Sequence, residues 1–404
     1  MKTVGVVTIH RILNHGSVLQ ALATCRAVAQ CGYEAKIIDY RYPSLYHLLH
    51  AQGFEIDNVP AGAGGIKGAV KRMLVSCGLR LAIPAWRWLK AAAGCREKAR
   101  RFREFRRRFL PLTGGMSRKR LHAEPPAFDA YMTGSDQTWN PRYLHRDFTF
   151  LLDFAPPGSP CISYGASFGA SSIGCEFRED YARLLDRYRS LSVRESSATA
   201  LVRDLTGREA KHVLDPTLLL ERDEWMEFAS PPDGIVKGRY IFCYCLDYVF
   251  NPFPGIVDEL SLLSERLGCP VVFYSCNARH NRIVSNKGFI IVPSMGPDEF
   301  LGLMDRASFV VSTSFHGVAF AVNFRKEFLA VLNPGASKDD RVSDFLQSMG
   351  LKQRGVVSGK PVSTDDLLQP IDYGAVEIRL RAAREDSKRY LASALHGVLE
   401  DASC

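Results

Sequence analysis

The stretch FVVSTSFHGVAFAVNF (309–324) contains the change of pattern that decides the fold class. Its first residues form an apolar run typical of a buried strand, and its last residues continue as an apolar helical segment. Hydroxyl side chains, a histidine and a glycine lie between the two. A buried strand, a polar loop and a helix in this order form the repeating unit of a parallel sheet covered by helices. The stretch therefore predicts an α/β fold.

The same unit recurs in the N-terminal half of the chain. TVGVVTI (3–9) is a strand-like run, and SVLQALATCRAVAQ (17–30) has helical spacing that stops near Gly32. Further strand-like runs are KIIDY (36–40), FDAYMTG (128–134), CISYGAS (161–167), LSVR (191–194) and KHVLDPTLLL (211–220). We expect a doubly wound, Rossmann-like domain over residues 1–228, with a basic helical insertion at about 66–120.

A second series of such units follows a linker. The linker is SPPDGIVKGR, around residues 229–238, and its proline and glycine content predicts a hinge between domains. The later strand-like runs are YIFCYCL (240–246), PVVFYSC (270–276), GFIIVP (288–293), FVVS (309–312), FLAVL (328–332) and VVS (356–358). They predict a second Rossmann-like domain over 239–371 and a closing helix within 372–404. Two such domains would face each other across a cleft.

Length and composition agree with this organisation. A chain of 404 residues exceeds one ordinary core, which favours two domains. The N-terminus does not have the basic, apolar and small-residue regions of a secretory signal, and no apolar run reaches about 18 residues. The 11 cysteines show no CxxC pairs, which argues against a disulfide framework or a zinc site. We expect a cytoplasmic protein with reduced thiols and no metal.

The positive charge is concentrated in one segment. Residues 66–120 carry 17 Lys or Arg and 2 acidic residues, although the whole chain has a net charge of only +9. The aromatic residues interleaved with these charges are Trp86, Trp88, Phe102, Phe105 and Phe109. A basic amphipathic helix with aromatic anchors suits an anionic membrane surface or a lipid-diphosphate substrate. A solvated charged face is the alternative, and no signature of an RNA-binding module is present.

The loop between the strand and the helix of 309–324 is the first candidate site. Ligands of doubly wound sheets bind outside the carboxyl ends of the strands, where His316 lies. A histidine transfers protons near neutral pH, and a helix N-terminus favours an anion. Ser312 and Ser314 add hydroxyl groups, and Gly317 leaves room for a ligand. A structural histidine is the alternative.

Arg194 and Asp136 define further candidate sites. Arg194 ends a strand, and its guanidinium can hold a carboxylate or phosphate with two hydrogen bonds. A salt bridge from Arg194 to Glu195 or Asp215 is the structural alternative. Asp136 follows a glycine turn and is a candidate base or a turn former. Trp139, three residues later, is a candidate platform for a sugar.

Two loops with small side chains complete the candidates for acceptor binding. SYGASFG (163–169) contains Tyr164 and Ser167 and has the small residues of a loop that approaches a ligand closely. NHGS (14–17) precedes the first helix and contains Asn14 and Ser17. Ser17 alone would explain this motif as an N-cap.

Several common catalytic motifs are missing from the sequence. The first strand is not followed by GxGxxG, and neither GxxxxGK[ST] nor GxSxG occurs. These absences argue against a dehydrogenase, a P-loop kinase and an α/β-hydrolase.

The ordered set of motifs resembles the polysaccharide pyruvyl transferase family. The motifs are TIHRILNHGSVLQA (8–21), TGSDQTWNP (133–141), SYGASFG (163–169), SVRES (192–196), VLDPTLLL (213–220) and STSFHG (312–317). The resemblance implies transfer of a pyruvyl group from phosphoenolpyruvate to two hydroxyls of a sugar, which forms a ketal. The acceptor would be an exopolysaccharide or capsule glycan, or its precursor linked to undecaprenyl diphosphate. The resemblance also implies a two-domain, glycosyltransferase-B-like fold. It implies no cofactor, with phosphoenolpyruvate as co-substrate.

The resemblance also assigns roles to residues. Arg194 matches the arginine that binds phosphoenolpyruvate, and His316 matches the catalytic histidine. Members of the family carry an arginine two residues before the histidine, where this chain has Ser314. Arg341 or Arg279 would then supply the missing positive charge to the donor. Asp136 would orient or deprotonate the acceptor, on an enzyme that is peripheral to the inner face of the cell membrane.

Two other functions stay open from the sequence. A glycosyltransferase of the same architecture would use a nucleotide sugar, with Asp339 or Asp340 as the carboxylate for the ribose. A non-catalytic glycan-binding relative would have kept the fold without the reaction.

Overall fold

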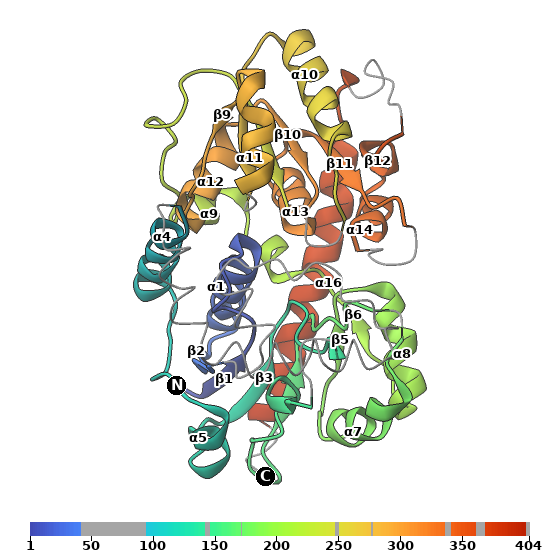
Figure 1. Cartoon of the computed structure of the whole chain (residues 1–404). Helices are drawn as coiled ribbons and strands as arrows, with labels where there is room; N and C mark the ends of the chain where they lie inside the picture. Colours follow the sequence, from blue (N-terminus) through green and yellow to red (C-terminus); the bar gives the residue numbers. More distant parts are fainter. Residues whose placement is uncertain are drawn as a thin grey trace, which may run out of the picture.

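The computed structural model describes residues 1–41, 94–141, 146–170, 172–246, 250–275, 278–335, 341–360 and 368–400. The side chains of residues 94, 95, 278, 279 and 281 are also outside this description. The predicted α/β class is confirmed: parallel sheets are covered by helices in both halves of the chain (Figure 1).

The N-terminal sheet is parallel and has the strand order β2-β1-β3-β4. Its strands are β1 (Thr3–Val7), β2 (Glu34–Ile37), β3 (Ala130–Thr133) and β4 (Cys161–Ser163). Isolated bridges from Ile162 to Ser190 and from Ala166 to Val193 continue it towards a pair of short strands. This pair is β5 (Ser192–Val193) and β6 (Lys211–His212). The chain reverses its direction across the sheet between β1 and β3, so the loops after these strands border a crevice.

The helices of the N-terminal half surround this sheet. They are α1 (His15–Gln30), α4 (Gly94–Phe109), α5 (Arg118–Ala123), α7 (Cys175–Leu185), α8 (Ser196–Thr206) and α9 (Arg222–Met226), with 3-10 turns η1 (Phe148–Leu151) and η2 (Pro216–Leu218). Helix α1 begins two residues earlier than predicted. Its N-cap is Asn14, whose side chain accepts a hydrogen bond from the Ser17 amide, so Ser17 is not the cap.

The C-terminal sheet is also parallel and has the order β12-β11-β10-β7-β8-β9. Its strands are β7 (Ile241–Cys245), β8 (Val271–Ser275), β9 (Ile290–Ile291), β10 (Phe309–Ser312), β11 (Glu327–Leu332) and β12 (Gly355–Val357). When these six strands are numbered along the chain, their arrangement across the sheet is that of a dinucleotide-binding sheet. The direction of winding changes between β7 and β10. The loop that carries His316 therefore lies at this change of direction.

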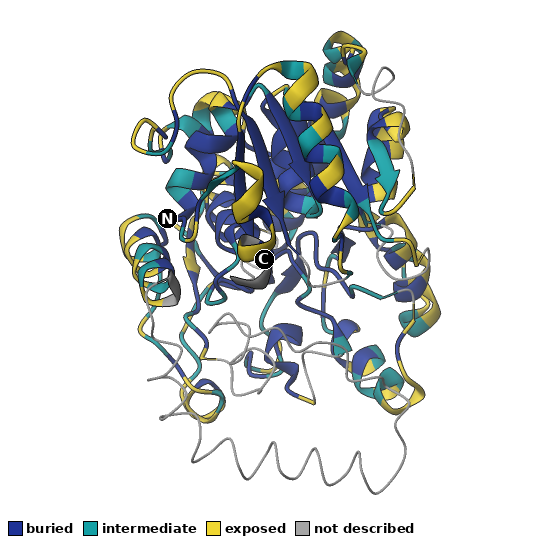
Figure 2. Ribbon diagram, turned by 45° about the horizontal axis from the view of Figure 1, so that its top comes forward, coloured by how far each residue is buried: buried dark blue, intermediate teal, exposed yellow. Residues whose placement is uncertain are grey.

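Helices cover both faces of the C-terminal sheet, and its inner strands are almost completely buried, whereas the edge strands β9 and β12 are partly exposed (Figure 2). These helices are α10 (Gly255–Leu267), α11 (Ala278–Val284), α12 (Pro297–Arg306), α13 (Phe315–Asn323) and α14 (Arg341–Met349), with 3-10 turns η3 (Ser285–Lys287) and η4 (Lys352–Arg354). Residues 229–238 join the halves without forming a helix or strand.

The terminal helix α16 (Tyr373–Leu399) runs along both halves of the molecule (Figure 1). Tyr390 donates a hydrogen bond to the Ser163 carbonyl at 3.1 Å, on the N-terminal side. Arg384 donates to Asn323 Oδ1 at 3.1 Å, on the C-terminal side. The helix therefore connects the two sheets. None of the helices in the described part of the chain is both long enough and apolar enough to cross a membrane.

Candidate functional site

The two points where the sheets change winding direction face each other. In the N-terminal half, the loop after β1 leads into α1, and the loop after β3 carries Asp136. The Ser17 hydroxyl donates a hydrogen bond to Asp136 Oδ2 at 2.5 Å. Asp136 has a φ of 73°, a left-handed backbone conformation that is uncommon outside glycine. Such backbone strain is concentrated at functional sites.

His316 approaches the same place from the C-terminal half. It is the second residue of α13, and it is 7% exposed. A Cβ atom added to Gly16 would lie 2.1 Å from His316 Nδ1. The imidazole therefore packs directly against the first turn of α1. The absence of a side chain at Gly16 makes this contact possible.

Arg194 is buried between carboxylates. Its Nη1 donates to Asp215 Oδ2 at 2.6 Å, and Glu195 and Asp136 lie 3.4 and 3.8 Å from other nitrogens of the guanidinium. The Phe315 ring lies against its Cζ atom at 4.9 Å. The salt bridges that were the structural alternative for Arg194 are therefore formed. They surround one positive charge with three carboxylates.

Asp215 connects Arg194 to His316. His316 Nε2 lies 3.5 Å from Asp215 Oδ2, within ion-pair distance but without a hydrogen bond. Burial alone would raise the pKa of Asp215, but His316 and Arg194 hold this pKa well below its usual range. Asp215 therefore stays ionised and can stabilise positive charge on the imidazole.

Two buried nitrogens at this point have no hydrogen-bond partner among the described residues. They are Arg194 Nη2 and His316 Nε2. Buried polar groups are normally paired, so unpaired donors or acceptors need an explanation. A polar ligand or water between the two halves would supply the missing partners.

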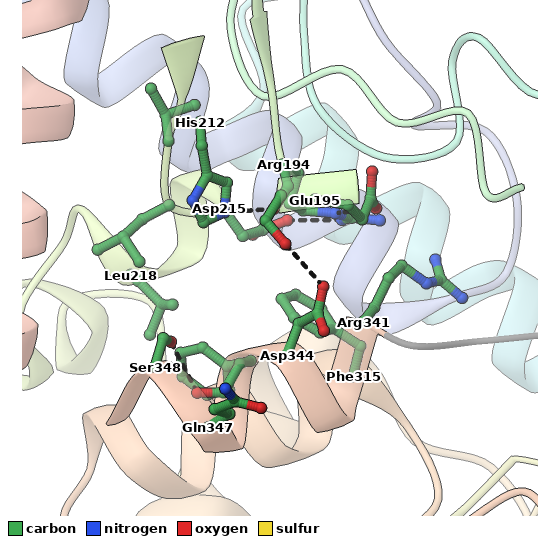
Figure 3. A pocket seen from close by; sticks show the side chains of 14 residues that line it. Arg194, Glu195, His212, Asp215, Leu218, Phe315, Arg341, Asp344, Gln347 and Ser348 are labelled. Carbon is green, nitrogen blue, oxygen red and sulfur yellow. Dashed lines mark hydrogen bonds and ion pairs between the residues drawn. The ribbon is translucent and has the colours of Figure 1, made fainter. Parts of the chain in front are cut away.

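A cavity of about 320 Å³ adjoins this cluster (Figure 3). Arg194, Glu195 and Asp215 lie on one wall, and Phe315, Arg341 and Asp344 lie on the facing wall. The Ser196 hydroxyl donates to Asp344 Oδ2 at 3.0 Å across the two halves. Asp215 is thus in contact with His316 and also faces the cavity.

Two helix N-termini border this region without side-chain caps. Helix α8 begins at Ser196, directly after Arg194 and Glu195, and α13 begins at Phe315. Neither N-cap residue forms a side-chain hydrogen bond to its helix. The unpaired amides and the helix dipoles therefore favour an anion between the two halves.

Three acceptor-binding candidates from the sequence lie in the core. Trp139 is fully buried, and its ring packs against Phe168 and Tyr188 at centroid distances of 5.3 and 5.8 Å. This burial counts against a sugar platform. Tyr164 and Ser167 are also buried, Tyr164 donating to the Leu214 carbonyl and Ser167 accepting from Gly169.

The remaining candidates have different surroundings. The space beside Gly317 is filled, because a Cβ there would lie 2.1 Å from the Ser312 hydroxyl. Close packing therefore explains this glycine without a ligand. Ser314 is the N-cap residue of α13. The Arg279 side chain, together with Asp339 and Asp340, lies outside the described residues.

The sequence did not select Asp215 or His212 as functional residues. The sequence offered Asp215 only as a salt-bridge partner of Arg194, although it lies in the family motif VLDPTLLL. His212 lines the cavity, and its Nε2 lies 3.1 Å from the Arg194 carbonyl oxygen. Within the described ranges, no group of three or more His, Cys, Asp or Glu has the arrangement of a metal site.

Structures similar to this one support the predicted fold. The UDP-GlcNAc 2-epimerase from Methanocaldococcus jannaschii is 14% identical and has a TM-score of 0.52, over 98% of this chain and 100% of that chain. The UDP-GlcNAc 2-epimerase from Neisseria meningitidis is 10% identical and has a TM-score of 0.47, over 98% of this chain and 99% of that chain. The glycosyltransferase SnogD from Streptomyces nogalater is 12% identical and has a TM-score of 0.45, over 99% of each chain. The likeness to the M. jannaschii epimerase and the two parallel sheets of the chain together confirm the predicted architecture of two Rossmann-like halves.

A search of curated proteins found no match. A protein-family model, described as polysaccharide pyruvyl transferase, matches residues 14–334. This range includes Ser17, Asp136, Arg194, Asp215 and His316. The chain therefore belongs to the polysaccharide pyruvyl transferase family, a family of transferases.

Proposed function

We propose that the protein transfers a pyruvyl group from phosphoenolpyruvate to two hydroxyls of a sugar in a cell-surface polysaccharide or its lipid-linked precursor. The observation that carries this proposal is the contact of Arg194 and His316 with one oxygen, Oδ2, of the buried carboxylate of Asp215. An anion-binding group from one half and a proton-transferring group from the other thus meet at a carboxylate that lines the cavity together with Arg194.

The charge balance decides where the donor binds. Because three carboxylates already surround Arg194, this residue alone cannot attract a molecule with both a carboxylate and a phosphate. Arg341 on the facing wall adds a second guanidinium, and α8 and α13 add their N-termini. We infer that Arg341 supplies the charge that other family members have at the position of Ser314. Ser314 and Ser312 then lie beside the donor site.

The proposed reaction is balanced in atoms and protons, and these residues can carry its proton transfers. A proton is added to the methylene carbon of phosphoenolpyruvate, and one sugar hydroxyl forms a bond to C2. The C2–phosphate bond then breaks, and the second hydroxyl forms the other C2–O bond of the ketal. Of the two hydroxyl protons, one is retained in the new methyl group and the other leaves with inorganic phosphate. His316 transfers these protons, and Asp136, held by Ser17 near Asn14, accepts a hydrogen bond from the acceptor.

The basic helix α4 supports a lipid-linked acceptor. Its exposed arginines recur at the spacing of one helix face and include Arg96, Arg100, Arg103 and Arg107. Phe102 and Phe105 anchor the opposite face in the core. A groove of about 640 Å³ separates the arginine face from the start of α12. Residues 66–93 of the predicted insertion, including Trp86 and Trp88, lie outside the described residues.

The reaction is tested by incubating the protein with phosphoenolpyruvate and undecaprenyl-diphosphate-linked sugars. We expect release of inorganic phosphate and a product heavier by the mass of one pyruvyl ketal in mass spectrometry. A parallel incubation with UDP-sugars measures release of UDP. Release of UDP without consumption of phosphoenolpyruvate would instead assign the protein to nucleotide-sugar transfer.

Membrane binding is tested separately with vesicles. We expect sedimentation with phosphatidylglycerol vesicles at low salt and weaker binding at about 0.15 M salt, where charges are screened over about 8 Å. Replacement of Arg96, Arg103 and Arg107 by Gln should abolish this binding. Replacement of Arg183, Arg203 and Arg389, which are exposed on other helices, is the control of equal charge. Equal binding by both triple variants would contradict the role of α4.

A further inference from the structure

Asp215 is held more rigidly than a simple counter-ion of Arg194 requires. Its Oδ1 accepts hydrogen bonds from the Thr217 amide at 3.0 Å and the Thr217 hydroxyl at 2.7 Å, as the cap of η2. These two bonds fix the rotation of the carboxylate. Its Oδ2 is thereby directed at Arg194, the Ser135 hydroxyl and His316.

The same cap occurs elsewhere in the N-terminal half, at a carboxylate that no histidine of the described residues contacts as an ion pair. Asp147 caps η1, and its Oδ1 accepts from the Thr149 amide at 3.2 Å and the Thr149 hydroxyl at 2.7 Å. Asp147 is also buried and also has an arginine partner, Arg118, at 3.5 Å. The cap therefore has a structural role at both positions. The contact with His316, from the other half of the molecule, distinguishes Asp215.

We propose that Asp215 is a positioning residue, whose Oδ2 orients the imidazole of His316 and stabilises its protonated form during proton transfer. This inference rests on the proposed function in assigning proton transfer to His316. The geometry favours it in two ways. Among the ion pairs of the described residues, Asp215 is the only charged group that contacts the ring, at Nε2. Gly16 packs against the opposite edge of the ring. The ring is thus fixed between α1 and Asp215.

The test compares Asp215→Asn with the matched control Asp147→Asn. Each change removes one buried charge but keeps an oxygen that can cap the 3-10 turn. We expect Asp215→Asn to lower kcat by about 10²-fold, the lower end of the contribution of general acid–base catalysis. We also expect the inflection of the kcat–pH profile to move to lower pH, because a nearby carboxylate favours the charged imidazole. Asp147→Asn should leave the pH profile unchanged.

A second pair of variants tests the same proposal if loss of the buried charge prevents the protein from folding. Thr217→Val and Thr149→Val each remove the hydroxyl that fixes one capping carboxylate, without changing any charge. We expect Thr217→Val to move the profile in the same direction by a smaller amount, and Thr149→Val to leave it unchanged.

The titration of the His316 ring can also be followed without substrate. NMR of histidine-labelled protein, with the His316 signal assigned from its loss in His316→Gln, should show a lower titration midpoint in Asp215→Asn than in the unaltered protein. This measurement tests the coupling even if the protein does not use phosphoenolpyruvate. An equal midpoint in both proteins, or equal effects of the Asp215 and Asp147 variants on the pH profile, would overturn the proposal.

Discussion

The two strand-to-helix junctions at the centre of the molecule differ in their electrostatics. Arg194 precedes α8 in the N-terminal half, and His316 begins α13 in the C-terminal half. Neither helix has a side-chain cap. Around Arg194 there are three carboxylates, whereas His316 has one charged neighbour, Asp215, among the ion pairs of the described residues.

This difference indicates a division of labour between the halves. Three carboxylates more than neutralise the fixed charge of Arg194, so the N-terminal half provides a stable electrostatic framework. In the proposed reaction, His316 of the C-terminal half transfers protons and so changes its charge. Variants of each junction should thus affect different kinetic constants.

The largest effect is expected from His316→Ala. Removing the proton-transferring group should lower kcat by about 10²- to 10⁴-fold. The protein should remain folded, because Arg194 still pairs with the Asp215 carboxylate. Phosphate release from phosphoenolpyruvate and a thermal melt measure the two quantities. His396→Ala, an exposed histidine of α16, is the control. Full turnover by His316→Ala would remove the catalytic role of this residue.

A smaller effect, on a different constant, is expected from Arg194→Lys. The lysine keeps the positive charge but loses the planar arrangement of donors. Loss of one charge-assisted hydrogen bond of about 1.5–3 kcal/mol should raise KM for phosphoenolpyruvate by about 10- to 100-fold, with a smaller change in kcat. Arg187→Lys is the control, because the Arg187 guanidinium donates hydrogen bonds to two backbone carbonyls, those of Leu152 and Ala155. A fall in kcat alone would contradict the division between the two junctions.

The fold could be predicted from local sequence patterns because the central strands of both sheets are short apolar runs. Runs such as YIFCYCL and FVVS become β7 and β10, and the terminal helix begins within a residue of its predicted start. Buried parallel strands have few alternatives at this length, so their order along the chain already limits the topology. The strand-to-helix loop that carries His316 could be located for the same reason.

The contacts inside the site could not be predicted in this way. Ser17 and Asp136 are separated by 119 positions but share a hydrogen bond. Asp215 was recognised only as a salt-bridge partner, because its contact with His316 depends on how the two halves pack. Trp139 follows a turn sequence that suggested exposure, yet its ring enters the core beside Phe168. Local patterns do not determine which way a loop side chain points.

The smallest effect is expected from Gly16→Ala, which tests how closely the two junctions must approach. Alanine at a helical position normally stabilises a protein by about 0.5–1 kcal/mol relative to glycine. Here its Cβ would overlap with the His316 ring, which must move. A misplacement of about 1 Å can lower a rate by about 10²-fold, and the ring absorbs part of the displacement, so we expect about a tenfold loss in kcat.

The control for this variant is Gly255→Ala, at the start of α10. A Cβ at Gly255 would have its nearest neighbour at 3.7 Å, an ordinary contact. This control should keep full activity and gain a small amount of stability, because nothing has to move. If Gly16→Ala showed the same result, the imidazole would not need its position against α1. Contact between the halves at Gly16 would then serve packing alone, and the orientation of His316 would depend on Asp215 and on α13.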